Sequence, residues 1–326
     1  MTTIIREPLT GPAVWRGPDL EPADYLHELT PSEITEIERV RDDLTARDID
    51  LGAIDPESVP LPGLEATIAG WLDRVENGVG FVVVRGLDID RWTEREAGLA
   101  FYAVGRQMGR PVKQNDRGHL LGHIRDTGKD IFTDQSARGY QVRIALPFHT
   151  DTSTDLLSLM CLRTAKEGGE SALAPLQTVY NEVLARRPDL IDTYYRPFNF
   201  DCRDEEHPDG GPFYTRVLAS VGTDGRFSLR HNSGYARSAA HRFDECPALT
   251  EQQDELLALV DELTQDPTIH VRFLLEQGDI VLVNNYAIAH ARSAFEDHDE
   301  PDRKRHLLRL WLVRYDGRPL APDFDN

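Results

Sequence analysis

The stretch Leu146-Pro147-Phe148-His149-Thr150-Asp151-Thr152 places a histidine and a carboxylate two residues apart. Strand side chains alternate with a period of two, so His149 and Asp151 point to the same side of an extended strand end. One backbone segment can then offer an imidazole nitrogen and a carboxylate oxygen to a single metal ion. A second histidine from elsewhere in the chain would complete the two-histidine, one-carboxylate face that suits a non-heme Fe(II) with open coordination positions.

The third ligand is expected near the end of a late strand, and eleven histidines compete for this role. His290 is the best candidate, because it follows a glycine turn and the apolar run 279–284. Its neighbours Ala289 and Ala291 are small and leave room for an ion and its ligands. His119 and His123 have a spacing that could bind metal on a helix, but their glycine-rich context does not favour a helix. Four further histidines sit in polar or helical surroundings, and we interpret them as ordinary hydrogen-bonded or solvated side chains: His27, His207, His241 and His298.

A basic and apolar run, Arg303-Lys304-Arg305-His306-Leu307-Leu308-Arg309-Leu310-Trp311-Leu312, begins 13 residues after His290. On a strand, Arg305, Leu307 and Arg309 share one face. A guanidinium group that points into a barrel is costly to bury unless an anion pairs with it, and its fork fits a carboxylate. The run therefore predicts an anion site near the metal, whereas the solvated edge of a strand explains Arg303 and Lys304 well enough.

The chain has 326 residues, 40% of them hydrophobic, which predicts a globular protein with a sizeable core. Residues 1–30 are rich in proline and glycine and predict an irregular lead-in, and the polar residues 112–140 predict a lid or loop region. Hydrophobic periodicity predicts helices at 31–44, 61–77, 93–108, 176–186 and 250–264. Strands are expected at 81–86, 141–149, 156–162, 213–221, 227–230, 271–275, 279–284 and 306–313, with a hairpin turn at 223–226. We expect one domain over 1–326, mainly β with flanking helices, around a double-stranded β-helix (jelly roll) core.

The formal net charge of −20 argues against nucleic acid or an anionic membrane as a partner, since both attract a basic surface. The chain has three cysteines and no CxxC pair. It shows no signal-peptide pattern at the N-terminus and no long apolar run, and together these features predict a cytoplasmic protein. Fe(II) also persists more easily in a reducing compartment. The expected partner is a small-molecule substrate, and the sequence leaves open whether the chain forms homo-oligomers.

Together, His149-x-Asp151, His290 and Arg305-x-x-x-Arg309 resemble the TauD/TfdA-like family of Fe(II)- and 2-oxoglutarate-dependent dioxygenases. The resemblance covers about residues 80–315. It implies that the histidines and the aspartate are catalytic ligands of Fe(II), and that Arg305 binds the distal carboxylate of 2-oxoglutarate. Arg309 would face the iron and the anionic end of cosubstrate or substrate. Gly168-Gly169-Glu170-Ser171 matches a family feature in which a hydroxyl residue after a double glycine contacts the cosubstrate, which implies that role for Ser171.

The resemblance also implies a reaction. An oxygenase of this family consumes O2 and 2-oxoglutarate, releases succinate and CO2, and oxidises an unactivated C–H bond, most simply by hydroxylation. Asp151 argues against the halogenating branch, which lacks that carboxylate. The expected substrate is small and carboxylate- or amino-acid-like, with secondary metabolism as a setting. Candidate substrate contacts are the polar residues next to the metal motifs, although polar strand edges explain Arg143 equally well: Tyr140, Gln141, Arg143, Asn285 and Arg309.

Two other classes of protein share part of this pattern. A non-catalytic jelly-roll sensor or binding protein could keep the metal ligands, but it would not need a buried Arg305 for a keto acid. A zinc hydrolase would need a general base beside the metal, and the sequence holds no HExxH or similar element. Both alternatives explain less of the sequence than the oxygenase does.

Overall fold

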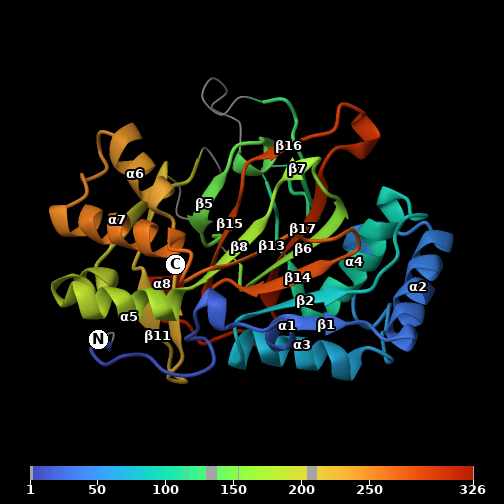
Figure 1. The fold of residues 1–326 in the computed structure, drawn as a ribbon, viewed down its shortest axis with the longest axis horizontal. Helices are drawn as coiled ribbons and strands as arrows, with labels where there is room; N and C mark the ends of the chain where they lie inside the picture. Colours follow the sequence, from blue (N-terminus) through green and yellow to red (C-terminus); the bar gives the residue numbers. More distant parts are fainter. Residues whose placement is uncertain (1–2, 116, 130–137, 153, 204–210, 326) are drawn as a thin grey trace.

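The structure is a computed structural model, and it describes residues 3–115, 117–129, 138–152, 154–203 and 211–325. Two β-sheets face each other at its centre (Figure 1). The larger has the strand order β1-β2-β14-β6-β17-β3, with β4 paired to β17, and the smaller has the order β13-β8-β15-β5. The larger sheet comprises β1 (Leu26–Glu28), β2 (Phe81–Arg85), β3 (Gly109–Pro111), β4 (Gly122–Ile124), β6 (Leu156–Arg163), β14 (Ile280–Asn284) and β17 (His306–Arg314). The smaller comprises β5 (Leu146–His149), β8 (Ser171–Pro175), β13 (Val271–Phe273) and β15 (Ile288–Arg292). The predicted jelly-roll core is confirmed.

Helices and three small hairpin-like sheets surround this core. The helices are α1 (Pro22–Tyr25), α2 (Pro31–Ala46), α3 (Glu65–Asn77), α4 (Glu94–Met108), α5 (Leu176–Arg186), α6 (Ser233–Arg242), α7 (Glu251–Gln265) and α8 (Pro322–Asp325). Short 3-10 helices are η1 (Gly17–Asp19), η2 (Leu51–Ala53), η3 (Gly139–Gln141), η4 (Pro188–Tyr195) and η5 (Pro301–Arg303). The small sheets pair β7 (Glu167–Gly168) with β16 (Phe295–Glu296), β9 (Phe198–Asp201) with β10 (Phe213–Arg216), and β11 (Ala219–Val221) with β12 (Phe227–Leu229). None of the helices described is long and apolar enough to cross a bilayer.

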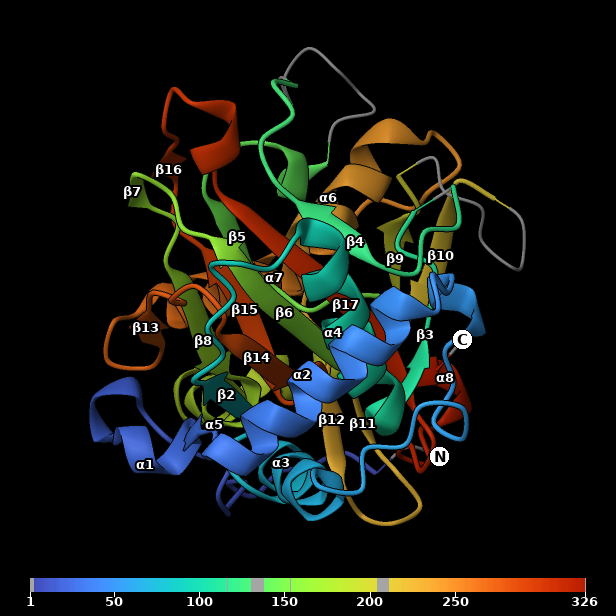
Figure 2. The same ribbon diagram turned by 90° about the vertical axis from the view of Figure 1, so that its right-hand side faces the viewer.

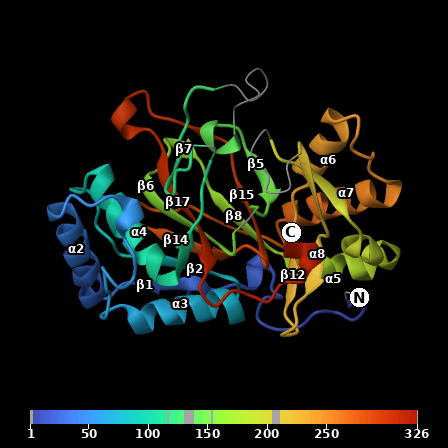
Figure 3. The same ribbon diagram turned by 180° about the vertical axis from the view of Figure 1, so that it is seen from behind.

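The two helical groups cover opposite outer faces of the sheets (Figures 1 and 3). Helices α2, α3 and α4 share one apolar cluster with outward side chains of the larger sheet, such as Val82 and Leu308. Figure 2 looks onto this side, with α2 and α4 in front of the strands. Helices α5 and α7 pack against the smaller sheet, where small outward residues such as Ala174 and Ala289 allow close approach.

The alternation of side chains decides what faces the space between the sheets. Along β17, Leu308, Leu310 and Leu312 lie in the outer cluster with α4, so the intervening residues point inward. Leu307 lies in the inner cluster, together with Leu173 of β8. The inward face of β17 therefore carries the arginines beside Leu307, as the sequence predicts.

The predicted helices are confirmed, and their start signals explain why. Thr30, Thr93 and Thr250 cap α2, α4 and α7, and each forms a capping box with the residue three positions later. The hairpin predicted around residues 223–226 is also confirmed, as the pair β11–β12.

Several local expectations are wrong or incomplete. The single strand expected at 213–221 forms two strands, β10 and β11, in different sheets, and the helix expected at 61–77 begins only at Glu65. The strand expected at 141–149 is only Leu146–His149, because residues 139–141 form a 3-10 turn and the pairing of β15 with β5 shifts register between His290 and Arg292. The lead-in over 1–30 is not wholly irregular, since β1 pairs in parallel with β2. Within 112–140, β4 pairs with β17; residues 116 and 130–137 of that region lie outside the described residues.

Candidate active site

The three predicted metal ligands lie together. His290 on β15 is the cross-strand partner of His149 on β5, and their ring centroids are 4.3 Å apart. Oδ2 of Asp151 lies 3.7 Å from Nε2 of His290, and one ligand atom from each residue lies within 4.8 Å of the other two. Two ligands with metal bonds near 2.1 Å are about 3 Å apart at right angles and roughly 4 Å apart when opposite. The donor set and its spacing therefore fit a single Fe(II)-type ion.

The protonation of both imidazoles suits metal binding. Nδ1 of His149 is 2.8 Å from the carbonyl oxygen of Pro147 and donates to it, which leaves Nε2 as the ligand atom. Burial, reinforced by the neighbouring His149, lowers the pKa of His290 to about 3. His290 is therefore neutral at physiological pH, as a ligand must be.

The carboxylate of Asp151 is held by side chains of β17. Nε1 of Trp311 donates a hydrogen bond of 2.8 Å to Oδ2 of Asp151. Burial by itself would raise the pKa of Asp151, but the charge of Arg309 and the bond from Trp311 help to outweigh it, and the pKa lies below its usual value. Sequence reasoning missed Trp311, although its position two residues after Arg309 on a strand puts it on the same inward face.

The loop that carries Asp151 is fixed from behind by Asn285. The side chain of Asn285 accepts a hydrogen bond from the backbone N–H of Asp151 and donates to the carbonyls of Asp151 and Thr154. It is 0% exposed. The structure does not support Asn285 as a substrate contact, because both ends of its side-chain amide bind the backbone of this loop.

Thr150 fixes the same loop from another side. Its backbone N–H donates to the carbonyl of His231, and the N–H of His231 donates to Oγ1 of Thr150. Since Thr150 is buried, the short motif His149-Thr150-Asp151 alternates in the usual way: the two ligands face the site and the residue between them anchors the backbone.

The double glycine brings Ser171 and Arg305 to one small cavity between the sheets. Gly169 has φ +76°, and a Cβ atom there would lie 2.8 Å from Nε of Arg305. Nη2 of Arg305 donates to the carbonyl of Gly169 at 3.4 Å. Ser171, Arg305 and Leu307 line the cavity. Glycine is needed here both for the left-handed backbone and for the close approach of the guanidinium.

Arg309 lies on β17, four residues after Arg305 and beside the metal ligands. Its guanidinium is stacked over the ring of Trp311 at 4.0 Å and lies 5.0 Å from the ring centroid of Tyr140. Nε of Arg309 donates to Oε1 of Gln114 at 2.7 Å. Because the side chain is buried and lines the large pocket, Arg309 presents a fixed cation close to Asp151.

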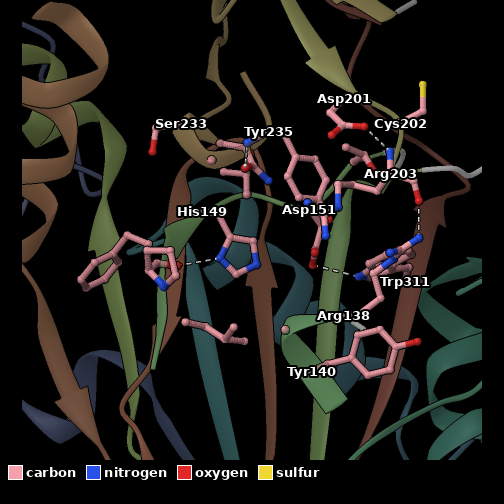
Figure 4. A pocket seen from close by; sticks show the side chains of 18 of the residues that line it. Arg138, Tyr140, His149, Asp151, Asp201, Cys202, Arg203, Ser233, Tyr235 and Trp311 are labelled. Carbon is pink, nitrogen blue, oxygen red and sulfur yellow. Dashed lines mark hydrogen bonds between the residues drawn. The ribbon is translucent and has the colours of Figure 1, made fainter. Parts of the chain in front are cut away.

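The large pocket opens beside the metal ligands (Figure 4). Tyr140 lines it, as expected, but Gln141 and Arg143 are not among its lining residues. Nε of Arg143 lies 3.1 Å from Oδ2 of Asp126, and the side chain is 59% exposed. Oε1 of Gln141 accepts a hydrogen bond from the N–H of Arg138. Neither side chain lines the pocket, so the structure does not support Gln141 and Arg143 as substrate contacts.

Further guanidinium groups line this pocket, and sequence reasoning missed all of them: Arg138, Arg203 and Arg216. Figure 4 shows Arg138 and Arg203 on the same wall, where Nη2 of Arg138 donates to the carbonyl of Arg203. The nearby carboxylate of Asp201 is paired with Arg242 at 2.8 Å. The pocket of this acidic protein is thus locally rich in cations, which favours an anionic ligand.

A second histidine cluster lies on the outer side of β17. Nδ1 of His123 and Nε2 of His306 are 2.9 Å apart, and Glu94 lies within 3.4 Å of both rings. Nη2 of Arg163 donates to Nδ1 of His306 at 3.1 Å, so a chain of hydrogen bonds already uses the ring nitrogens. One ligand atom from each of Glu94, His123 and His306 lies within 4.8 Å of the other two, so the ranking of His119 and His123 below His290 stays a prediction.

Known proteins are similar to this chain in sequence and in fold. The family model described as taurine catabolism dioxygenase TauD, TfdA family, matches residues 43–311. FR-33289 synthase from Streptomyces rubellomurinus is 32% identical over 323 residues, which is 98% of this chain and 94% of the relative. An asparagine oxygenase structure with Fe(II), 3-hydroxyasparagine and succinate has a TM-score of 0.67 at 19% identity, covering 89% of this chain and 93% of that one. The non-heme iron oxygenase OrfP with Fe and α-ketoglutaric acid has a TM-score of 0.65 at 17% identity, covering 88% and 94%.

Proposed function

This chain belongs to the TauD/TfdA family of dioxygenases, and we propose that it hydroxylates an unactivated C–H bond of a small anionic, carboxylate- or amino-acid-like substrate. It is a 2-oxoglutarate-dependent non-heme iron dioxygenase that uses Fe(II), 2-oxoglutarate and O2. When bound, Fe(II) would supply an oxidant from O2 and 2-oxoglutarate, and the 2-oxoglutarate would be converted to succinate and CO2. The chain's own residues bind, orient and shield the reactants.

One observation carries this proposal: His149, Asp151 and His290 converge, and two of them, His149 and Asp151, line the large pocket that Arg309 also lines. In the proposed site these three residues would hold Fe(II) beside the pocket. Trp311 orients the Asp151 carboxylate, and Asn285 fixes the backbone behind it.

The cosubstrate is proposed to lie along the inward face of β17. Arg305 and Ser171 would bind its distal carboxylate in the small cavity, and Arg309 would face its other end or the substrate. A guanidinium fork and a hydroxyl are suitable donors for a carboxylate. The apolar surroundings, such as Leu307, exclude water and strengthen these contacts.

The substrate class rests on the guanidinium groups that line the large pocket. Arg138, Arg203 and Arg216 come from different segments of the chain, and all three line the pocket. The structurally similar asparagine oxygenase and OrfP are described with hydroxylated amino acids, which supports an amino-acid-like substrate here. Tyr140 would complete the wall near the iron.

A reducing, cytoplasmic location is part of the proposal. It is supported by Cys161, Cys202 and Cys246, none of which forms a disulfide. The sensor alternative is less favoured, because a protein that only held metal would gain nothing from burying Arg305 beside Ser171.

The test is a screen for substrate-stimulated succinate release, with Fe(II), O2 and 2-oxoglutarate present, across amino acids and small carboxylic acids. The proposal expects stimulation by a compound that carries a carboxylate, together with a product that has gained one oxygen atom. Stimulation only by compounds without a carboxylate would contradict the substrate class. Absence of any Fe(II)-dependent succinate formation would contradict the reaction.

A further inference from the structure

Arg292 is a buried cation that neither the metal site nor the substrate pocket explains. It is 7% exposed, and Nη2 donates to the carbonyls of Val142 at 2.7 Å and Ile144 at 2.5 Å. Among the described residues, Nε and Nη1 of Arg292 have no hydrogen-bond partner, and its guanidinium forms no ion pair with a carboxylate. A buried guanidinium with two unused donor groups is costly and calls for an anion.

The sheet register places Arg292 beside the cosubstrate subsite. Arg292 on β15 is the cross-strand partner of Ser171 on β8, just as His290 is the partner of Leu173. Directly paired residues project from the same face of a sheet, and Leu173 belongs to the inner cluster between the sheets. Arg292 and Ser171 therefore both project toward the interior, two residues along from the metal ligand.

Arg305 reaches the same place from the opposite sheet. The guanidinium groups of Arg292 and Arg305 lie 4.8 Å and 5.1 Å from the ring centroid of Phe295. The charge of Arg305 acts on Arg292, and a carboxylate between the two guanidinium groups and Ser171 would relieve their repulsion.

We propose that Arg292 is a positioning residue that links the distal carboxylate of 2-oxoglutarate to residues 142–144, the backbone that leads into His149. This inference rests on the proposed function, because it takes Ser171 and Arg305 as the cosubstrate subsite. Nη2 of Arg292 holds the carbonyls of Val142 and Ile144, and Nε and Nη1, which have no partner among the described residues, are the donors available to the carboxylate. Binding of the cosubstrate then fixes Arg292, and through it the wall of the substrate pocket next to Tyr140.

The test uses the full chain with Mn(II) in place of Fe(II), so that no turnover occurs, and 2-oxoglutarate as the ligand. Calorimetry gives the Kd, and hydrogen exchange reports on the amides of residues 142–146 with and without the ligand. In the wild type, 2-oxoglutarate is expected to slow this exchange. In Arg292→Met, the Kd should rise at least about tenfold, as expected for losing a charge-assisted bond, and the ligand-induced slowing should disappear.

Two comparison variants separate this role from a general loss of structure. Arg305→Met should also raise the Kd, but its exchange at 142–146 without ligand should match the wild type, since Arg292 still holds the two carbonyls. Arg47→Met, which removes an exposed ion pair with Asp43 at 2.9 Å, should change neither quantity. If Arg292→Met does not fold, Arg292→Lys keeps the cation but not the fork, so the slowing should still be lost.

Each outcome decides a different point. A wild-type Kd together with wild-type slowing in Arg292→Met, or in Arg292→Lys, would overturn the inference. If Arg305→Met raised the Kd in that case, the cosubstrate subsite would stand and only the role of Arg292 would fail. If Arg305→Met also bound 2-oxoglutarate as tightly as the wild type, the failure would lie in the proposed cosubstrate subsite itself.

Discussion

Trp311 Nε1 donates a 2.8 Å hydrogen bond to Oδ2 of Asp151, the same oxygen that lies 3.7 Å from Nε2 of His290. An indole on β17 therefore orients a carboxylate in the loop after β5, so both sheets contribute to the metal centre. Partners of this kind fix the direction of a ligand's lone pairs, and their removal commonly lowers metal affinity by about 10- to 100-fold.

Replacing Trp311 by phenylalanine should weaken Fe(II) binding by about tenfold, because the ring is kept while the donor to Asp151 is lost. The measurement is anaerobic titration of the metal-free protein. Trp92→Phe is the matched control: Trp92 lies under Arg41 on the helical side and should leave the affinity unchanged. Equal Fe(II) affinity in Trp311→Phe and wild type would exclude the orienting role.

Replacing Asn285 by alanine should lower the free energy of unfolding by about 1–3 kcal/mol, since buried groups of Asp151 and Thr154 lose their partners. Denaturant unfolding of the metal-free protein measures this change. Asn77→Ala, at the exposed end of α3, should have a much smaller effect. A variant of Asn285 with wild-type stability and only a raised KM for substrate would instead restore the original expectation of a substrate contact.

Replacing Gly169 by alanine should displace Arg305, because the added Cβ would lie 2.8 Å from Nε and the backbone has φ +76°. We expect the affinity for 2-oxoglutarate to fall roughly tenfold or more, the effect of losing one charge-assisted contact. Gly52→Ala is the control, as a Cβ there meets no atom within 4 Å. Unchanged cosubstrate affinity in Gly169→Ala would argue against Arg305 as the carboxylate ligand.

His306 predicts a dependence of stability on pH. Burial, with a contribution from His123, lowers its pKa to about 3 from the usual 6.5 of a histidine. The unfolded chain therefore binds more protons between these two pH values, so the free energy of unfolding falls as pH drops from 6.5 toward 3 and is unaffected by this group above 6.5. His306→Gln should give a shallower slope between pH 6 and 4 in denaturant unfolding, whereas exposed His241→Gln should not. An identical slope in His306→Gln would contradict a buried neutral imidazole.

Periodicity made the ligand set and the arginine face predictable from the sequence. The alternation along residues 305–311 places Arg305, Arg309 and also Trp311 on one inward face, because leucines occupy the other face and pack on α4. His290 was identifiable by its small neighbours in an apolar strand. These features depend on local geometry alone, which a sequence expresses directly.

Other parts of the site depend on how distant loops meet, and local pattern does not encode that. Arg138 and Arg203 lie outside the regular predicted elements, Arg216 lies in a predicted strand, and the three come together only in the folded chain. Asn285 precedes a metal ligand in sequence, yet it faces the back of the Asp151 loop. Arg143 does not line the pocket, and the strand expected from residue 141 begins only at Leu146, after a 3-10 turn at 139–141.

The most direct test of the metal centre is the Fe(II)- and O2-dependent conversion of 2-oxoglutarate to succinate by Asp151→Ala beside the wild type. Without the carboxylate of Asp151, only His149 and His290 would remain as protein ligands of Fe(II), so we expect succinate formation to fall to the level of a control without added iron. Asp126→Ala, a carboxylate outside the metal centre, should retain activity. Succinate formation at the wild-type rate in Asp151→Ala would contradict the assignment of His149, Asp151 and His290 as the iron ligands.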